Sequence, residues 1–297
     1  MPLNLNQLRV FNAICEELSM TAAARRLQIS QPAVSKQLSE LEQSIGTALV
    51  DRLPRGIRLT QAGELLKLHA RRLFQAEEGA ELALAELLGL SAGRLSVGAS
   101  TTIGGYLVPP LLGEFSARFP KIVLELTIGN TEAIIQAVLE GELDLGLTEG
   151  LVTAEGVEHS VFAHDTMVAI VTAKHPQAGK RGLPVRELAA LPWISRERGS
   201  GTRAVIEAAL AARGVRVEPS MTLGSTEAIK NAVAAGLGCA MVSRKTVELE
   251  LEIGRLVELD VDGLHVPRAL HLVTLKGKQP SPAASEFMER LRAHYAV

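Results

Sequence analysis

The fold of the N-terminal region is predicted by the stretch SMTAAARRLQISQPAVSKQL, residues 19–38. Ser19 can cap a helix over residues 20–27, where three consecutive alanines favour helical backbone. Ser30 can cap the next helix, because Pro32 falls in its first turn, where the missing N–H costs no hydrogen bond. Two helices joined by so short a turn are typical of a helix-turn-helix.

The second of these helices is predicted to end at Gly46 and has one apolar face. That face consists of Ala33, Val34, Leu38, Leu41 and Ile45. The opposite face begins with small and amide side chains, which can reach base edges when such a helix enters the major groove of DNA. Residues 5–18 also have helical spacing, so we expect a head of three helices.

A basic hairpin follows these helices. Residues 48–50 and 57–59 are predicted strands, and Arg52 and Arg55 lie in the turn of this wing, which could touch phosphates or the minor groove. Residues 20–72 carry nine Lys or Arg against four acidic residues, a net charge of +5, whereas residues 91–297 carry 21 basic and 23 acidic residues. A basic head on a nearly neutral body favours a polyanion as partner, although a solvated basic surface would also explain the charge.

A long helix is predicted over residues 61–90, with Thr60 as its cap. Positions with heptad spacing are almost all apolar along it: Ala62, Leu66, His69, Leu73, Ala76, Ala80, Ala83 and Leu87. A helix of this length has to bury such a stripe. Two alternatives remain: the stripe pairs with a second copy of the chain, or it packs on its own domain.

The order of these motifs resembles the N-terminal signature of the LysR-type transcriptional regulators. The resemblance lies in residues 8–11 (LRVF), 19–27 (SMTAAARRL), 30–35 (SQPAVS), 41–42 (LE) and 60–63 (TQAG). It implies an all-α winged helix-turn-helix over residues 1–60, a dimerising linker helix over 61–90, and an α/β effector domain like the periplasmic binding proteins over 91–297. It further implies double-stranded promoter DNA as partner, a tetramer built from two dimers, and a possible contact with RNA polymerase. We expect DNA contacts from Thr21, Gln31, Pro32, Ala33, Ser35, Lys36, Arg52 and Arg55.

The body of the chain alternates strands and helices. Predicted strands at residues 94–99, 123–128 and 143–148 are separated by helical patterns, which indicates parallel pairing with crossover helices. A second such unit is predicted to start near Thr166, and the chain returns through a strand at 270–274 and a closing helix at 285–295. We expect two subdomains, one of about residues 91–162 and 266–297 and the other of about 163–265, with a ligand cleft beyond the strand ends.

Hydroxyl side chains gather at these predicted strand ends and helix starts. They are Ser100, Thr101, Thr102, Thr131, Thr148, Ser200, Thr202 and Ser225. Free N–H groups at a helix N-terminus favour an anion, although Ser and Thr begin helices everywhere as ordinary caps. Residues 196–203 and 223–230 resemble the LysR-type branch that regulates carbon-fixation and sulfur-assimilation genes, whose effectors are small anionic metabolites.

Several classes of protein are disfavoured by the sequence. Two distant cysteines exclude a disulfide scaffold and a cysteine zinc site, and the seven histidines show no metal-binding spacing. A G-x-S-x-G elbow is missing, which disfavours a hydrolase, and residues 236–241 lack the third glycine of a dinucleotide fingerprint. Since no nucleophile–base or metal constellation is found either, we expect neither an enzyme nor a cofactor. Since the N-terminus shows no secretory signal and no apolar run could span a membrane, we expect a cytoplasmic protein. A metabolite-controlled DNA-binding regulator is the main hypothesis; a small-molecule-binding protein or enzyme with a basic interaction module, and an architectural DNA-binding protein, are the alternatives.

Overall fold

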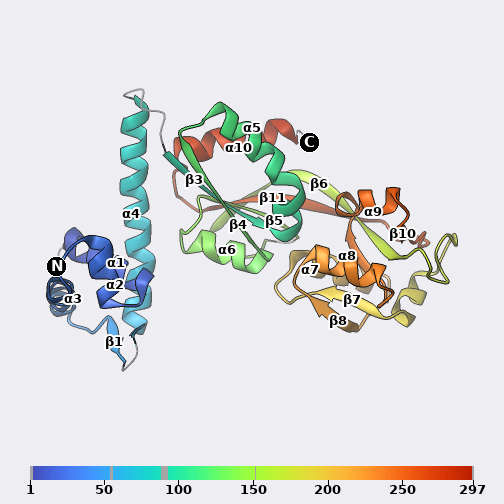
Figure 1. Ribbon diagram of the computed structural model, residues 1–297, viewed down its shortest axis with the longest axis horizontal. Coiled ribbons are helices and arrows are strands. Elements are labelled where there is room, and N and C mark those ends of the chain that lie inside the picture. Colours follow the sequence, from blue (N-terminus) through green and yellow to red (C-terminus); the bar gives the residue numbers. More distant parts are fainter. Residues whose placement is uncertain (1–2, 54–55, 88–92, 151, 296–297) are drawn as a thin grey trace. The chain divides into compact units, whose positions relative to one another are not determined.

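The computed structural model describes residues 3–53, 56–87, 93–150 and 152–295. The chain forms two compact units, residues 1–81 and 82–297 (Figure 1). Within the described residues, no helix is long and apolar enough to cross a membrane.

The first unit begins with the three predicted helices. They are α1 (Leu5–Glu17), α2 (Met20–Leu27) and α3 (Gln31–Ile45). Ser19 Oγ accepts the N–H of Ala22 and Ser30 Oγ accepts the N–H of Ala33, both at 3.3 Å, so both predicted caps are confirmed. Gly46 ends α3 at φ 83°, a left-handed conformation that favours glycine. The core between the helices includes Leu8, Phe11, Ile14, Val34, Leu38 and Leu41.

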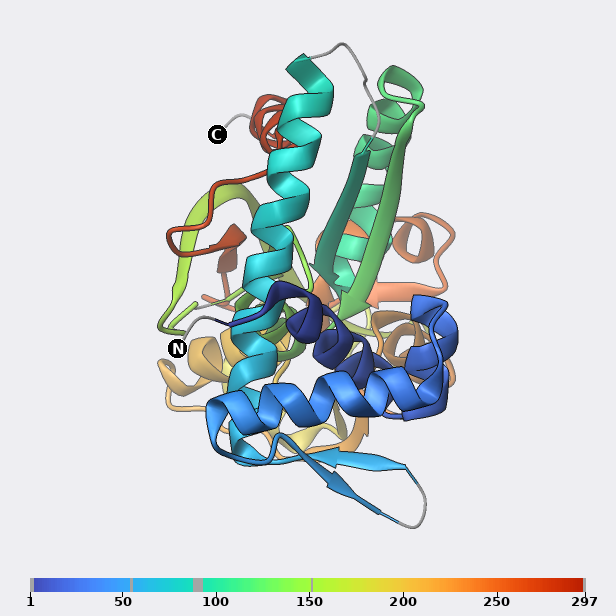
Figure 2. The same ribbon diagram turned by 90° about the vertical axis from the view of Figure 1, so that its left-hand side faces the viewer.

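Strands β1 (Val50–Arg52) and β2 (Ile57–Leu59) form the antiparallel wing, seen as a light-blue hairpin beside α3 in Figure 2. The first strand begins two residues later than predicted. The reason is that neighbouring backbone groups bind side chains: Leu49 N–H donates to Glu42 Oε1 at 2.7 Å, and Thr60 Oγ1 donates to the carbonyl of Ala48 at 2.8 Å.

Helix α4 (Gln61–Leu87) begins as predicted, with Thr60 Oγ1 accepting the N–H of Gly63 at 3.1 Å. Gly63 is required here, because a Cβ at this position would overlap the carbonyl oxygen of Leu49. The heptad stripe has two parts. Ala62 and Leu66 pack against the core of the head, whereas His69, Leu73, Ala76 and Ala80 are exposed. The side chains of Ala83 and Leu87 lie outside the description.

The second unit starts with a parallel arrangement. Its first elements are β3 (Gly93–Ser100), η1 (Ile103–Leu107), α5 (Val108–Arg118), β4 (Ile122–Gly129), α6 (Thr131–Leu139) and β5 (Leu145–Glu149). Both β4 and β5 pair in parallel with β3, as predicted. Helix α5 and the closing helix α10 (Pro282–His294) pack on one face of this sheet, and α6 packs on the other.

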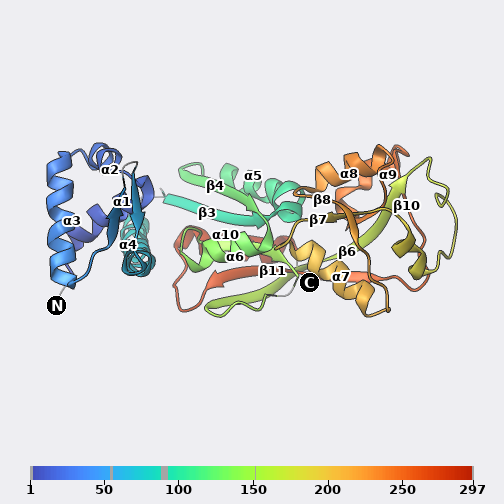
Figure 3. The same cartoon turned by 90° about the horizontal axis from the view of Figure 1, so that it is seen from below.

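Two long antiparallel strands, β6 (Val157–Thr172) and β11 (Val266–Leu275), run through both subdomains (Figure 3). Their register extends from Val266 opposite Met167 to Leu275 opposite Val157, with one irregularity between Leu270 and His271. The strand near Thr166 therefore belongs to this crossing pair and does not start a second parallel unit, which corrects the expectation from the sequence.

The second subdomain contains the remaining elements. They are η2 (Val185–Ala190), β7 (Trp193–Arg196), α7 (Gly201–Ala211), β8 (Pro219–Leu223), α8 (Thr226–Ala234), β9 (Ala240–Ser243), η3 (Arg244–Thr246), α9 (Glu248–Glu252) and β10 (Leu256–Glu258). Strand β7 pairs in parallel with β8 and, through Trp193 and Cys239, lies beside the start of β9. The sequence did not predict β8 as a strand, since none of its residues is fully buried and it therefore shows no apolar run.

Candidate functional sites

The turn between α2 and α3 presents the start of α3 to solvent. Gln28 ends α2 in a left-handed conformation at φ 56°, and Ser30 then caps α3. Gln31, Pro32 and Lys36 are exposed, Ala33 and Ser35 are half-buried, and Thr21 of α2 is exposed.

The ammonium group of Lys36 is available to bind another group. Its Nζ lies 3.8 Å from Glu40, with 77% of the side chain exposed, so this ion pair is weak. Arg55 and the side chain of Arg52 lie outside the description. Of the remaining predicted DNA-contact residues, five thus lie at the start of α3, and Thr21 lies in the first turn of α2.

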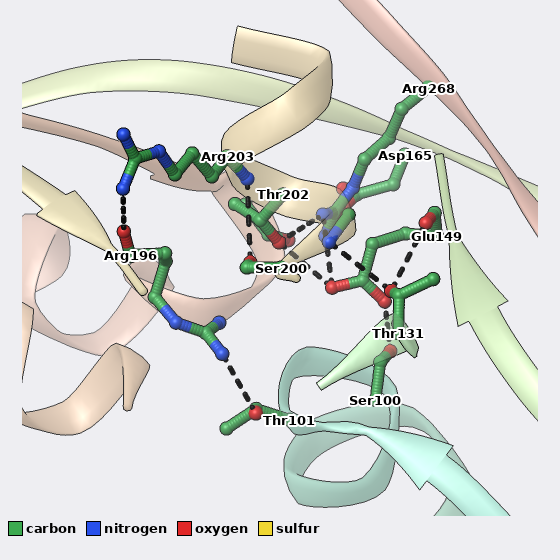
Figure 4. A network of polar contacts seen from close by, with 12 residues as sticks. Ser100, Thr101, Thr131, Glu149, Asp165, Arg196, Ser200, Thr202, Arg203 and Arg268 are labelled. Atoms are coloured by element: carbon green, nitrogen blue, oxygen red, sulfur yellow. Dashed lines mark hydrogen bonds and ion pairs between the residues drawn. The ribbon is translucent and has the colours of Figure 1, made fainter. Parts of the chain in front are cut away.

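Several of the predicted effector residues meet where the two subdomains join (Figure 4). Ser100 ends β3, Thr131 begins α6, and Thr202 lies in the first turn of α7. All three are buried, and all three bind the same residue, Glu149 at the end of β5. We name this region the junction and define it by Ser100, Thr101, Thr131, Glu149, Asp165, Arg196, Thr202 and Arg268.

Glu149 lies at the centre of the junction and is 1% exposed. Its Oε1 accepts the hydroxyl of Thr202 at 2.8 Å, and its Oε2 accepts the hydroxyl of Ser100. Its carbonyl oxygen accepts the hydroxyl of Thr131 at 3.3 Å. The carboxylate thus already uses two of the hydroxyl donors that the sequence assigned to an effector.

Arg268 and Asp165 extend this network on the crossing strands. They are directly opposite each other in the ladder, and Arg268 Nε and Nη2 donate to Asp165 Oδ2 at 2.9 and 2.7 Å. Arg268 Nη1 donates to Thr202 Oγ1 at 2.9 Å and lies 3.6 Å from Glu149 Oε1. One guanidinium therefore binds groups from β5, β6 and α7. Because β5 belongs to the first subdomain and α7 to the second, Arg268 links the two subdomains.

The N-termini of α6 and α7 also meet at the junction. Gly201 N–H donates to Thr131 Oγ1 at 3.3 Å, and Glu132 N–H donates to the carbonyl of Gly199 at 3.2 Å. A Cβ on Gly201 would overlap the carbonyl oxygen of Glu149, so this close approach requires glycine. These helix-start N–H groups, which the sequence suggested were open to an anion, are bound by the protein itself.

Arg196, at the end of β7, has a different environment. It is 3% exposed, and its Nη2 donates to Thr101 Oγ1 at 3.0 Å. Its Nε and Nη2 also bind the carboxylate of Glu197 at 2.8 Å. Its Nη1 is buried and has no hydrogen-bond partner among the described residues.

The other predicted effector residues have separate roles. Ser200 Oγ accepts the N–H of Arg203 at 3.4 Å, and Ser225 Oγ accepts the N–H of Ala228 at 3.1 Å, so both act as helix caps. Thr102 is buried before η1. Thr148 is fully buried opposite His271, and its hydroxyl has no partner within the described part of the chain.

An open pocket of about 570 Å³ adjoins the junction between α6 and α7. Arg198 and Arg203 line it together with Glu132 and Glu207, and Arg203 Nε donates to Glu207 Oε1 at 2.7 Å. Its volume is in the range of small-molecule sites. Among the described residues, no group of three or more His, Cys, Asp and Glu side chains is arranged to hold a metal ion.

Glu149, Asp165 and Arg268 were not predicted as site residues from the sequence. A charged residue inside or next to an apolar strand run was a signal that could have singled out each of them, because an ionised side chain is rarely buried without a partner. Which partner each charge binds depends on strand pairing, and no local pattern gives that.

Comparison with known proteins agrees with this architecture. Residues 5–64 match the model described as "Bacterial regulatory helix-turn-helix protein, lysR family", and residues 88–296 match the "LysR substrate binding domain". The chain is 39% identical over 289 residues to a RuBisCO operon transcriptional regulator of Allochromatium vinosum, covering 97% of this chain and 95% of that one.

Two solved structures are similar in fold. The regulatory domain of CcmR from Synechocystis PCC6803, in complex with 2-PG, has a TM-score of 0.64 and 33% identity, covering 68% of this chain and 97% of that one. Full-length CbnR, solved as a complex with its target DNA, has a TM-score of 0.69 and 24% identity, covering 98% of this chain and 99% of that one.

Proposed function

The chain belongs to the LysR family of transcriptional regulators. From this premise we propose a function for each of its parts. It is a regulator and not an enzyme. The start of α3 reads bases in the major groove of promoter DNA, and the wing adds phosphate contacts. A small anionic metabolite binds at the junction and changes how the chain holds that DNA. The protein acts in the cytoplasm, where this DNA is found.

The exposed part of the α4 stripe supports a homodimer. His69, Leu73, Ala76 and Ala80 are not covered by the head, and Leu73 is 38% exposed. A helix with an uncovered apolar stripe is stabilised by pairing with a second copy. Two such dimers would form the tetramer that the family resemblance implies, and a contact with RNA polymerase would let the bound tetramer act on transcription.

An anionic effector is supported by the junction. The observation that carries the proposal is the convergence of hydroxyl and guanidinium groups from β3, α6, β7 and α7 at one place between the subdomains. CcmR, a 33% identical relative, was solved with 2-PG, a phosphorylated carboxylate. A ligand that binds one arrangement of the subdomains more tightly than another shifts the population toward it.

Fluorescence anisotropy with the full-length chain tests this proposal. The probe is labelled DNA from the region upstream of the gene that encodes the chain, with a scrambled duplex of the same composition as control. We expect affinity for the upstream duplex to exceed that for the scrambled one and to fall steeply with salt, because bound Lys and Arg release counterions. Addition of 2-PG or inorganic phosphate should change the affinity. Equal affinity for both duplexes at physiological salt would refute the DNA-binding role, and no response to either anion would refute the effector role.

A further inference from the structure

The junction has two halves that differ in whether their donors are already used. In the first half, Ser100, Thr202 and Arg268 all lie against Glu149. An anion entering there would have to replace the chain's own carboxylate, since both hydroxyl donors point at it. Glu149 therefore occupies the place that the sequence suggested for an effector.

In the second half, a donor is left without an acceptor. Arg196 is almost fully buried, yet its Nη1 binds nothing within the described part of the chain. A buried N–H of a charged group without an acceptor is costly, because it has lost its hydrogen bonds to water.

The two halves are adjacent along the chain. Ser100 hydrogen-bonds Glu149, and the next residue, Thr101, accepts the hydrogen bond from Arg196 Nη2. Figure 4 shows Arg196 pointing toward Thr101 from the second subdomain, with Glu149 on the far side of the β3 end. A guanidinium with one free N–H can bind a phosphate or carboxylate oxygen by a charge-assisted hydrogen bond.

We propose that Arg196 receives the anionic group of the effector and that Glu149 is an internal carboxylate which keeps anions out of the Ser100–Thr202 half. The ligand class is a small metabolite with a phosphate or carboxylate group, bound at Nη1 of Arg196 beside Thr101. Glu149 acts as a specificity residue, since it confines the anion to one half of the junction. This inference rests on the proposed effector function and assigns its residues.

The first experiment measures binding of inorganic phosphate and 2-PG to the full-length chain by isothermal titration calorimetry. Arg196→Met should weaken the anion that binds wild type by about ten- to hundredfold, the range for loss of a hydrogen bond to a charged group. Arg198→Met is the matched control, because Arg198 lies two residues away, is exposed and lines the adjoining pocket. It should leave the dissociation constant unchanged. Arg196→Lys, which keeps the charge and loses the planar fork, should bind with reduced affinity and serves if Arg196→Met does not fold.

The second experiment tests the internal carboxylate by gain of binding. Glu149→Ala removes the carboxylate and frees Ser100, Thr202 and Arg268, so acetate should bind the variant and raise its melting temperature by more than it raises that of wild type. Glu149→Gln fills the same space with a neutral amide and should not respond to acetate. A lack of acetate stabilisation in Glu149→Ala would overturn the role assigned to Glu149.

The outcomes separate this inference from the proposed function. If wild type binds phosphate or 2-PG and Arg196→Met binds it equally well, the assignment to Arg196 is wrong while the effector function stands. If Arg198→Met loses as much affinity as Arg196→Met, the anion binds the pocket between α6 and α7 and the assignment is again wrong. If wild type binds neither anion at about 10 mM, both the effector function and this inference fail.

Discussion

Replacing Arg268 by leucine should destabilise the effector unit severely. The Arg268 and Asp165 side chains are 1% and 2% exposed, and Arg268 also contacts Glu149, which is equally buried. Without the guanidinium, two carboxylates remain buried, and no other cation among the described residues forms an ion pair with them. Removal of one partner from a buried ion pair costs about 3–5 kcal/mol, a large part of the total stability of a domain.

Urea denaturation followed by Trp193 fluorescence measures this loss. Trp193 is the only tryptophan of the chain and is 3% exposed in the core of the second subdomain, so its emission reports unfolding of the effector unit. Arg94→Leu is the matched control, because Arg94 forms an exposed ion pair with Glu125 and should cost less than about 1 kcal/mol. The double variant R268L/D165L should recover part of the loss, since it also removes one stranded carboxylate. A loss in R268L no larger than in R94L would refute the view that this network ties the subdomains together.

Four further outcomes are expected. Gln31→Ala should relax base preference, with about 1–3 kcal/mol of discrimination lost at one base pair in competition binding, because Gln31 is exposed at the start of α3. Leu73→Glu should dissociate or aggregate the chain in light scattering, since each copy would place a charge in the paired stripe; a monomeric wild type at micromolar concentration would contradict this. Burial, together with the charges of His159 and His164, lowers the pKa of His271 below 6.5. The folded state therefore binds fewer protons than the unfolded state, and the free energy of unfolding falls as the pH drops below that value. His271→Gln should flatten this pH dependence of stability, measured by urea titrations between about pH 7 and 5. Burial raises the pKa of the Cys15 and Cys239 thiols to about 12, so neither should react with a thiol reagent until its unit unfolds, which native-state labelling with mass spectrometry can check.

The parts of the fold that depend on near neighbours in the chain were predictable. Ser19, Ser30 and Thr60 cap helices that start where the sequence predicts, because a cap needs only a hydroxyl and the N–H groups two or three residues later. The parallel pairing of β3, β4 and β5 followed from alternation of strand and helix patterns. The expected site residues were partly brought together, with Ser100, Thr131 and Thr202 at one junction.

The residues that organise this junction could not be found in the same way. Glu149, Asp165 and Arg268 are far apart in the sequence, and their contacts exist only because β11 pairs with both β5 and β6. Strand β8 escaped prediction for a related reason, since most of its side chains face solvent and it carries no apolar alternation. Register between distant strands is a property of the folded chain that a local pattern does not contain.

The crossing pair β6 and β11 determines which movements the effector unit can make. Hydrogen bonds along the ladder resist sliding of one strand past the other, whereas twisting the pair changes each bond only slightly. The irregularity at Leu270 and His271 interrupts the regular ladder, and the Arg268–Asp165 pair lies two residues from it. We therefore expect the pair to twist more easily than its strands slide. A turn of about 5° at that point, carried over an arm of about 20 Å, or six residues of strand, displaces the end of a subdomain by about 2 Å. If the proposed ligand turned the pair at this point, its contact with a few side chains would move the distant end of a subdomain by about the diameter of an atom.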